Sequence, residues 1–177
     1  MNNLSQKSKN LNILVLNNAL PFITTHFRLS SIFYSLQLVD IFAYEVLANK
    51  FTDTAAHVSK PYSTVLVYNF HSLYTQDRFF LFVNNNGATN TTSSRFSGSV
   101  NVASITEMFS AANWLEREVS ELHGGNFNGK KDLRNLMLQY GDSSSPFQKS
   151  FPTIGLKEMY YEPLKDTIIQ NPVSLQL

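Results

Sequence analysis

The chain has 177 residues, of which 43% are hydrophobic and 15% charged, and its formal net charge is +1 at pH 7. This length allows one domain with a sizeable core, and the near-neutral charge argues against a nucleic-acid partner, because neutralising several phosphates requires a basic face. The sequence has no cysteine, which excludes disulfides, thiolate zinc sites and cysteine-bound iron–sulfur clusters within it.

No segment suits the crossing of a bilayer. The longest apolar stretch, residues 32–47, contains Gln37, Asp40 and Glu45 and is shorter than the roughly 20 residues that a membrane-spanning helix needs. Residues 1–10 lack the features of a signal or transit peptide and are predicted to be flexible. The sequence therefore predicts a chain without a membrane span.

The first predicted element is a helix. Leu11–Leu16 is largely apolar, and Asn17 or Asn18 is a candidate N-terminal cap for a helix over Leu20–Leu29. Pro21 is compatible with this assignment because proline is tolerated in a first helical turn.

Strands follow this helix. Leu36–Glu45 has apolar residues at both odd and even positions, which is typical of a central strand covered on both faces. Ser63–Phe70 and Arg78–Val83 are β-branched and aromatic, and a turn near Thr75–Asp77 predicts that they form an antiparallel hairpin. Ser99–Val102 is a candidate third paired strand.

Two polar segments separate these elements. Lys50–Lys60 ends before Pro61, and Asn84–Ser97 is rich in turn-forming residues. Both are predicted to be surface loops.

The helix that carries the densest charge is predicted next. Ser104 and Glu107 have the spacing of a capping box, so a helix is expected from there to Leu122, with a break near Asn113. Gly124–Gly125 would stop it.

The C-terminal part predicts a short helix and then an arm. Asp132 is a candidate cap for a helix over Leu133–Gln139. The domain is therefore expected to cover residues 11–140, and residues 141–177, which are punctuated by prolines and have no long periodic run, are expected to form an extended arm.

This arm predicts a partner. Ordering roughly thirty residues costs on the order of 45 kcal/mol, and offsetting that at about 25 cal/mol per Å² requires burial of on the order of 1,800 Å² of apolar surface. A large obligate interface is therefore favoured, and packing of the arm back on its own sheet is the alternative. The arm carries these large apolar residues: Phe147, Phe151, Ile154, Leu156, Met159, Tyr160 and Tyr161.

Within the charged helix, Arg117 has the i, i+4 spacing to pair with Glu121, and Trp114 lies on one face with Glu118. A buried ion pair is one interpretation of the Glu116–Glu118 run, and a solvated helix face is the other. Catalysis by these acids would need a neighbouring base or nucleophile, and the sequence indicates none.

The sequence also predicts no metal or cofactor site in this chain. His26, His57, His71 and His123 lack the spacing of metal ligands, and His123 is better interpreted as a helix C-cap residue that is favourable to the helix dipole. No phosphate-binding glycine loop or nucleophile motif is present.

A series of motifs carries a family resemblance. They are Leu38-Val39-Asp40, Val67-Tyr68-Asn69, Ser72-Leu73, the Ala112–Glu118 segment ANWLERE, Asp132-Leu133-Arg134, Tyr140-Gly141, Pro146-Phe147, Lys149, Phe151-Pro152, Gly155, Glu158 and Tyr161. Together they resemble the 30 kDa subunit of respiratory complex I, whose bacterial counterpart is designated by the letter C.

The sequence departs from this family pattern at several charged positions. Glu121–Gly124 stands where the family has Asp-Met-Phe-Gly, Lys130–Lys131 replaces His-Pro, Asn135 replaces an arginine, and Gln148–Ser150 replaces Arg-Lys-Asp. A divergent mitochondrial version, from a protist, would fit. The docking residues that the resemblance carries over are Trp114, Arg117, Glu118, Asp132, Arg134, Lys149, Phe151 and Pro152.

The resemblance implies a two-layer α+β domain with helices on a mixed β-sheet, followed by a C-terminal arm that wraps over neighbours. It implies a non-catalytic subunit of the matrix arm at the mitochondrial inner membrane, scaffolding the quinone-reducing module. Expected partners are the subunit resembling a hydrogenase large chain and the subunit with the terminal iron–sulfur cluster. FMN and all clusters would belong to partner subunits. The many Asn, Phe and Tyr residues suggest organellar encoding.

Two alternatives remain open from the residues alone. One is an independent α+β module that binds RNA or protein through exposed Phe79, Phe80 and Phe82. The other is a hydrolase that uses the Glu-Arg-Glu helix, which would need a sealed pocket around Glu118.

Overall fold

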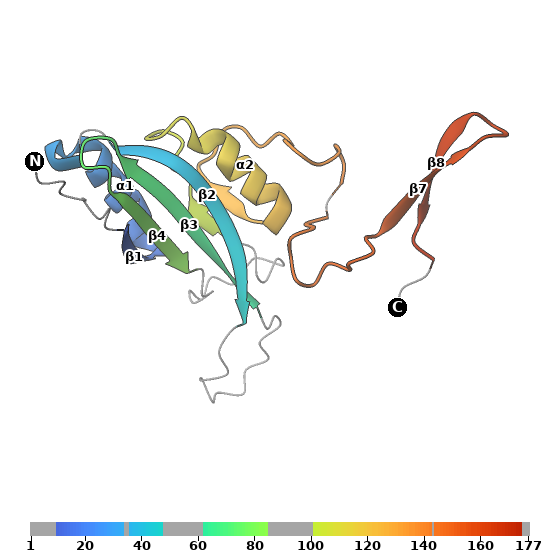
Figure 1. The fold of residues 1–177 in the computed structure, drawn as a ribbon, viewed down its shortest axis with the longest axis horizontal. Helices are drawn as coiled ribbons and strands as arrows, with labels where there is room; N and C mark the ends of the chain where they lie inside the picture. Colours follow the sequence, from blue (N-terminus) through green and yellow to red (C-terminus); the bar gives the residue numbers. More distant parts are fainter. Residues whose placement is uncertain (1–9, 34–35, 48–61, 85–100, 143, 175–177) are drawn as a thin grey trace, which may run out of the picture.

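The computed structural model describes residues 10–33, 36–47, 62–84, 101–142 and 144–174 (Figure 1). The predictions for Lys50–Lys60 and for all but the first residue of Asn84–Ser97 lie outside this part. The elements are β1 (Asn10–Leu16), the 3-10 turn η1 (Asn17–Ala19), α1 (Leu20–Leu29), the 3-10 turn η2 (Ser31–Phe33), β2 (Leu36–Leu47), β3 (Tyr62–Ser72), β4 (Arg78–Asn84), β5 (Asn101–Ala103), α2 (Ala112–His123), β6 (Asn126–Asn128), β7 (Lys157–Glu162) and β8 (Thr167–Pro172).

A four-stranded mixed sheet organises the fold. Its strand order is β1-β4-β3-β2, with β1 parallel to β4 and the other neighbours antiparallel. The predicted hairpin of β3 and β4 is confirmed, and its turn is closed by the backbone N–H of Ser72, which donates to the carbonyl of Asp77 at 3.0 Å. Together with the helices, this sheet confirms the predicted α+β class.

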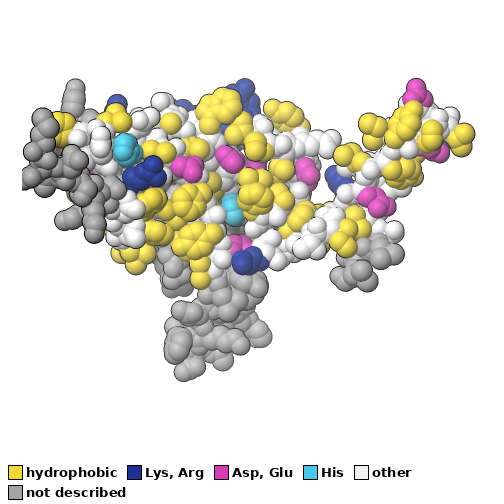
Figure 2. Space-filling view, in the orientation of Figure 1, with side chains coloured by type: hydrophobic (Ala, Val, Ile, Leu, Met, Phe, Trp, Pro, Cys, Tyr) yellow, Lys and Arg dark blue, Asp and Glu magenta, His cyan; other side chains and the backbone are white. Residues whose placement is uncertain are grey.

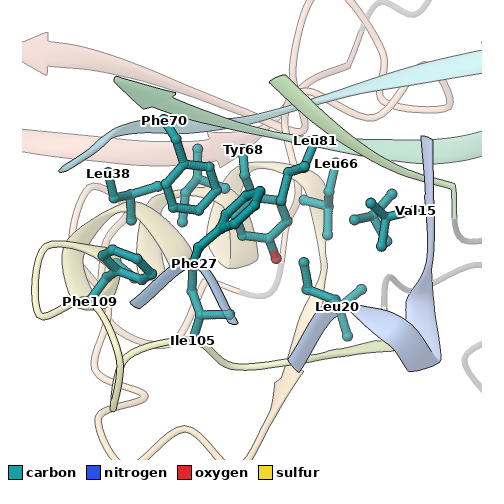
Figure 3. Packing of buried hydrophobic residues seen from close by; sticks show 14 of the residues in the cluster. Val15, Leu20, Phe27, Leu38, Leu66, Tyr68, Phe70, Leu81, Ile105 and Phe109 are labelled. Carbon is teal, nitrogen blue, oxygen red and sulfur yellow. The ribbon is translucent and has the colours of Figure 1, made fainter. Parts of the chain in front are cut away.

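Both helices pack on the same face of this sheet. Side chains of β2, β3 and β4 that point to this face meet α1 and α2 in one core. Figure 3 shows the rings of Phe27, Phe70 and Phe109 gathered on this side, with ring centroids 5.7 Å apart for Phe27 and Phe70 and 5.2 Å apart for Phe70 and Phe109. Phe79 also belongs here, since its ring is 5.8 Å from that of Phe33. The ring of Phe79 is therefore not available to stack on an RNA base, as the RNA-binding alternative would require.

The prediction that β2 is a central strand covered on both faces is wrong. It lies at the edge of the sheet. Residues such as Ile41 are buried beneath α2, whereas the alternate side chains stay open on the other face. Apolar residues occupy both faces, but only one is covered by the described part of the chain. The open side chains and their exposed fractions are Val39 49%, Phe42 42%, Tyr44 40% and Val46 41%.

The N-terminal region contains a strand that the sequence did not predict. Leu11–Leu16 belongs to β1, which adds to the sheet beside β4. The predicted helix Leu20–Leu29 is confirmed as α1, and Pro21 lies in its first turn. The N-cap residue of this helix is Ala19 rather than Asn17 or Asn18, because the intervening residues form a 3-10 turn.

The charged helix starts later than its capping-box pattern predicts. After β5, the N–H groups of Met108 and Phe109 both donate to the carbonyl of Ile105, at 3.0 Å each, so Ser104 begins only a tight turn. The continuous helix begins at Ala112. The candidate paired strand over Ser99–Val102 corresponds in its described part to β5, which pairs in parallel with β6 in a separate two-stranded sheet.

The C-terminal arm ends in a hairpin. Strands β7 and β8 pair only with each other in the described part of the chain, and Figure 1 shows them projecting away from the domain. Met159, Tyr161 and Ile168 are more than half exposed on this hairpin. A single two-stranded hairpin is marginally stable in water, so these apolar side chains favour a covered state.

Candidate docking site

At the start of α2 lies a buried ion pair. The carboxylate of Glu116 accepts hydrogen bonds from the backbone N–H of Ile105 at 2.9 Å and from the hydroxyl of Ser104 at 2.7 Å. Its Oε2 also lies 3.2 Å from Nζ of Lys130, and the two side chains are 0% and 2% exposed. The Lys130 ammonium further donates to the carbonyl of Asn113 at 2.8 Å. The pair therefore ties α2 to the segments before and after it.

This environment changes the ionisation of nearby groups. Burial lowers the pKa of Lys130, although the adjacent Glu116 carboxylate partly offsets the effect. Burial also raises the pKa of Tyr68, and the negative charge of Glu116 adds to the rise. Because a buried ammonium without a counter-ion is costly, the Glu116 carboxylate is what keeps Lys130 charged inside the domain.

Arg117, on the next position of α2, holds the segment that follows β6. Its guanidinium donates to the carbonyls of Arg134 at 2.7 Å and Asn135 at 3.0 Å. Nη1 lies 3.7 Å from Oδ2 of Asp132, and the guanidinium carbon is 5.4 Å from the centre of the Trp114 ring. Arg117 is only 8% exposed, so it acts inside this chain and positions the segment rather than reaching a partner directly.

Glu121 holds the same segment from the opposite end. Its carboxylate accepts from the backbone N–H groups of Leu136, of Met137 at 2.8 Å and of Leu138 at 3.0 Å. Burial opposes ionisation, but these three donors and nearby Arg117 outweigh it and lower the pKa of Glu121 below its ordinary value.

These contacts correct two predictions. Arg117 and Glu121 do not form the expected i, i+4 pair, and residues 133–139 are not helical. In a helix, the backbone N–H and carbonyl groups of that segment would bond to each other. Here the side chain of Arg117 donates to the carbonyls of Arg134 and Asn135, and the carboxylate of Glu121 accepts from the three N–H groups that follow. The backbone of the segment is therefore bonded to α2 and has no regular secondary structure.

The Glu121 contacts predict a pH dependence. Because the folded pKa is lowered, the carboxylate stabilises the fold above its ordinary value of 4.5 and this contribution is lost as the pH falls through the folded value. We expect Glu121→Gln to lower the free energy of unfolding at pH 7. The difference in free energy of unfolding between the variant and the unsubstituted chain should become smaller as the pH falls below 4.5. Urea unfolding between pH 7 and pH 3 measures this. A difference that stays constant with pH would contradict it.

Asp132 and Arg134 form a bidentate ion pair at the surface. Oδ1 and Oδ2 of Asp132 accept from Nε and Nη2 of Arg134, both at 2.9 Å. The hydrogen bonds from Arg134 hold the pKa of Asp132 well below its ordinary value. The Arg134 side chain is 73% exposed, so it presents a cation on the surface, and Trp114, whose ring lies beside the guanidinium of Arg117, is 61% exposed.

The end of α2 is closed by the beginning of the arm. Gly124 adopts a left-handed φ of 69° as the C-cap, which confirms the predicted stop. Gln148 donates from its side chain to the carbonyl of His123 at 2.9 Å, and the N–H of Phe147 donates to Leu122 at 2.9 Å. The C-cap residue is therefore Gly124 and not the predicted His123, which ends the helix, and burial lowers the pKa of the His123 imidazole.

Gly124 is predicted to be intolerant of a side chain. A Cβ there would lie 2.6 Å from Nε2 of Gln148 and 2.8 Å from Oγ of Ser145, whereas Gly129 has a similar φ of 81° and nothing within 4 Å. Both Gly→Ala variants carry the strain of a left-handed backbone, about 1–2 kcal/mol. We expect Gly124→Ala to lose about 1–3 kcal/mol more, because Ser145 and Gln148 must move. Denaturant unfolding compares them, and equal losses would contradict the close approach.

The structure gathers some of the predicted docking residues and separates others. Trp114, Arg117, Asp132 and Arg134 form one cluster beside α2. Glu118 lies half-buried on the face of α2 toward β2. The remaining three residues belong to the arm. Lys149 is exposed, and its backbone N–H donates to the carboxylate of Glu45 at 2.7 Å. Phe151 and Pro152 are half-buried.

The long-range partners of the acidic residues in this site were not predicted from the sequence. A buried ion pair was one interpretation of the Glu116–Glu118 run, but its partner Lys130 was not identified, and Glu121 was paired only with Arg117. The partners of Glu116 and Glu121 lie 11 to 17 positions away in the chain, which no local pattern shows. The one available signal was that the acids of this helix do not all lie on one face, since Glu116 lies away from Glu118 and Glu121.

The family assignment follows from comparison with known proteins. Residues 29–157 match the family described as respiratory-chain NADH dehydrogenase, 30 kDa subunit. The chain belongs to this family. The resemblance inferred from short motifs is thereby confirmed.

Curated relatives match over a shorter region. The NADH-quinone oxidoreductase component designated C is 44% identical over 75 residues in Polynucleobacter asymbioticus and 41% identical over the same length in Ralstonia nicotianae. In each case the match covers 42% of this chain and 38% of the relative, well under half of the relative's length. A solved structure of Nqo5, the trypsin-resistant fragment 1–134, has a TM-score of 0.46 and 22% identity, covering 75% of this chain and 86% of that chain.

Within the described residues, no helix is both long and apolar enough to cross a membrane.

Proposed function

We propose that this chain is a non-catalytic core subunit of the peripheral, matrix-side arm of respiratory complex I. In this role it scaffolds the quinone-reducing module while electrons pass from NADH to ubiquinone and protons are translocated. The family match over residues 29–157 carries the proposal. The projecting hairpin supports it, because exposed apolar strands outside a domain suit an obligate interface.

The proposed partners are the quinone-site subunit that resembles a hydrogenase large chain and the subunit with the terminal iron–sulfur cluster. The chain has no cysteine to hold an iron–sulfur cluster, so the clusters are proposed to lie in partner subunits, and FMN is proposed to lie there as well. The exposed members of the docking set, Trp114, Arg134 and Lys149, are proposed to contact these partners. Arg117 and Asp132 would hold the contacting segment in shape.

We place this function at the matrix side of the mitochondrial inner membrane. The 14 Phe and 8 Tyr residues, together with many Asn residues, suit an AT-rich organellar genome.

Native gel electrophoresis of a mild-detergent extract of inner membranes tests the proposal. We expect the chain to migrate with complex I, and mass spectrometry of that band to identify the two proposed neighbours. Migration as a free chain would contradict the proposal. Salt-sensitive RNA binding in a filter assay would favour the alternative of an RNA-binding module, because its affinity should fall steeply with salt.

A further inference from the structure

A cavity of about 420 Å³ opens between β2 and α2, beside the start of the arm. Its apolar walls come from Ile41, Val119, Leu122 and Phe147. Figure 2 shows hydrophobic side chains on both sides of acidic and histidine side chains in this region of the surface. The cavity therefore has an apolar lining with polar groups set into it, the combination found where side chains or ligands are bound.

The polar groups of this cavity are incompletely paired. Glu118 makes no hydrogen bond or ion pair with any residue that the structure describes. Glu45 accepts only from the backbone N–H of Lys149 within that part. His123 is 8% exposed, and its Nδ1 is buried without a partner in the described chain. A buried nitrogen such as Nδ1 of His123 is normally satisfied, and the half-buried carboxylate of Glu118 beside it is open to a donor from outside the described chain.

The charge balance indicates which donor is missing. Two carboxylates, Glu45 and Glu118, face the cavity against one ammonium, that of Lys149, which lies on the exposed rim. Burial lowers the pKa of His123, although the charge of Glu45 partly offsets the effect, so a neutral imidazole beside the two acids does not repel a cation. A cationic donor is therefore complementary to this cavity, and an anion is not.

We propose that an arginine side chain of a neighbouring subunit occupies the cavity between β2 and α2, with its guanidinium on Glu118. This inference rests on the proposed function, since it names the chemistry by which the chain is held in its complex. The aliphatic stem of the arginine lies against Leu122, and the planar guanidinium lies beside the exposed ring of Phe147. Arginine fits better than lysine, because a planar fork pairs with a carboxylate bidentately and stacks on an aromatic face.

Charge removal at Glu118 tests the proposal in the assembled complex. We compare Glu118→Gln with the control Glu107→Gln, which removes an exposed acid outside the cavity that pairs with Lys131. Complex isolated in mild detergent is washed with increasing NaCl, and release of this chain is followed on native gels. We expect Glu118→Gln to release about tenfold faster than the unsubstituted chain, and Glu107→Gln to stay within about twofold.

A second variant leaves Glu118 intact. Phe147 is replaced by the photo-crosslinker p-benzoylphenylalanine, and the cross-linked peptide from the illuminated complex is identified by mass spectrometry. A partner peptide with an arginine at or next to the linked position supports the proposal. A link to a second copy of this chain, to a free small molecule or to a peptide without an arginine overturns it, as do equal release rates of the two Gln variants. Absence of the unsubstituted chain from complex I would instead refute the proposed function.

Discussion

Removal of the β7–β8 hairpin is expected to abolish stable assembly while leaving the domain folded. A chain that ends at Ile154 retains the contacts of the arm with α2 and β2, namely those of Phe147, Gln148 and Lys149. It loses the exposed apolar strands, which have no cover of their own. We expect the melting temperature of the domain to change little and the amount of assembled complex I on native gels to fall at least about tenfold.

A second truncation separates docking from folding. A chain that ends at Tyr140 also loses the hydrogen bonds from Phe147 and Gln148 that close α2. It should therefore lose about 1–2 kcal/mol of stability in addition to assembly, because the last carbonyls of the helix become unsatisfied. Normal assembly of the chain ending at Ile154 would refute the docking role of the hairpin. Flavin reduction in the complex that still forms should be unchanged in both cases.

The buried pair of Glu116 and Lys130 is expected to give the largest effect on stability. Glu116→Gln leaves the Lys130 ammonium buried without its counter-ion. Breaking a buried pair in this way typically costs about 3–5 kcal/mol, a large part of the stability of a single domain. Urea unfolding of the purified chain should show this loss.

A double variant serves as the control for this prediction. In Glu116→Gln combined with Lys130→Met, no buried charge remains, so most of the lost stability should return. The double variant should still be slightly less stable than the unsubstituted chain, because the carbonyl of Asn113 and the N–H of Ile105 each lose a charged hydrogen-bond partner. A loss below about 1 kcal/mol in the single variant would show that the pair is not a structural determinant.

Several parts of this fold were predictable because local patterns decide them. The α1 helix, the strands of the β3–β4 hairpin and the stop at Gly124 each depend on periodicity, β-branched composition or a glycine C-cap. The family was recognised for a similar reason, since its motifs are short and contiguous. Sequence alone identified these features because their causes lie within a few residues of each other.

Other parts depend on distant residues and were not predictable in this way. The segment 133–139 has a helical pattern, but Arg117 and Glu121 take its backbone groups. The β2 strand has apolar residues on both faces, and only the packing of α2 determines which face is covered. In the docking set, spacing placed Trp114 and Glu118 on one face of the helix, but it did not reveal that their neighbour Arg117 turns inward.

The parallel pairing of β1 with β4 constrains the order in which the sheet is completed. Residues of β1 such as Asn10 bond beside residues of β4 such as Arg78, which come far later in the chain. During synthesis, β1 leaves the ribosome first but has no partner until β4 has emerged and the β3–β4 hairpin has formed. β1 is thus made before the strand it pairs with, and its core residue Val15, which is 3% exposed in the folded sheet, stays in contact with water until then.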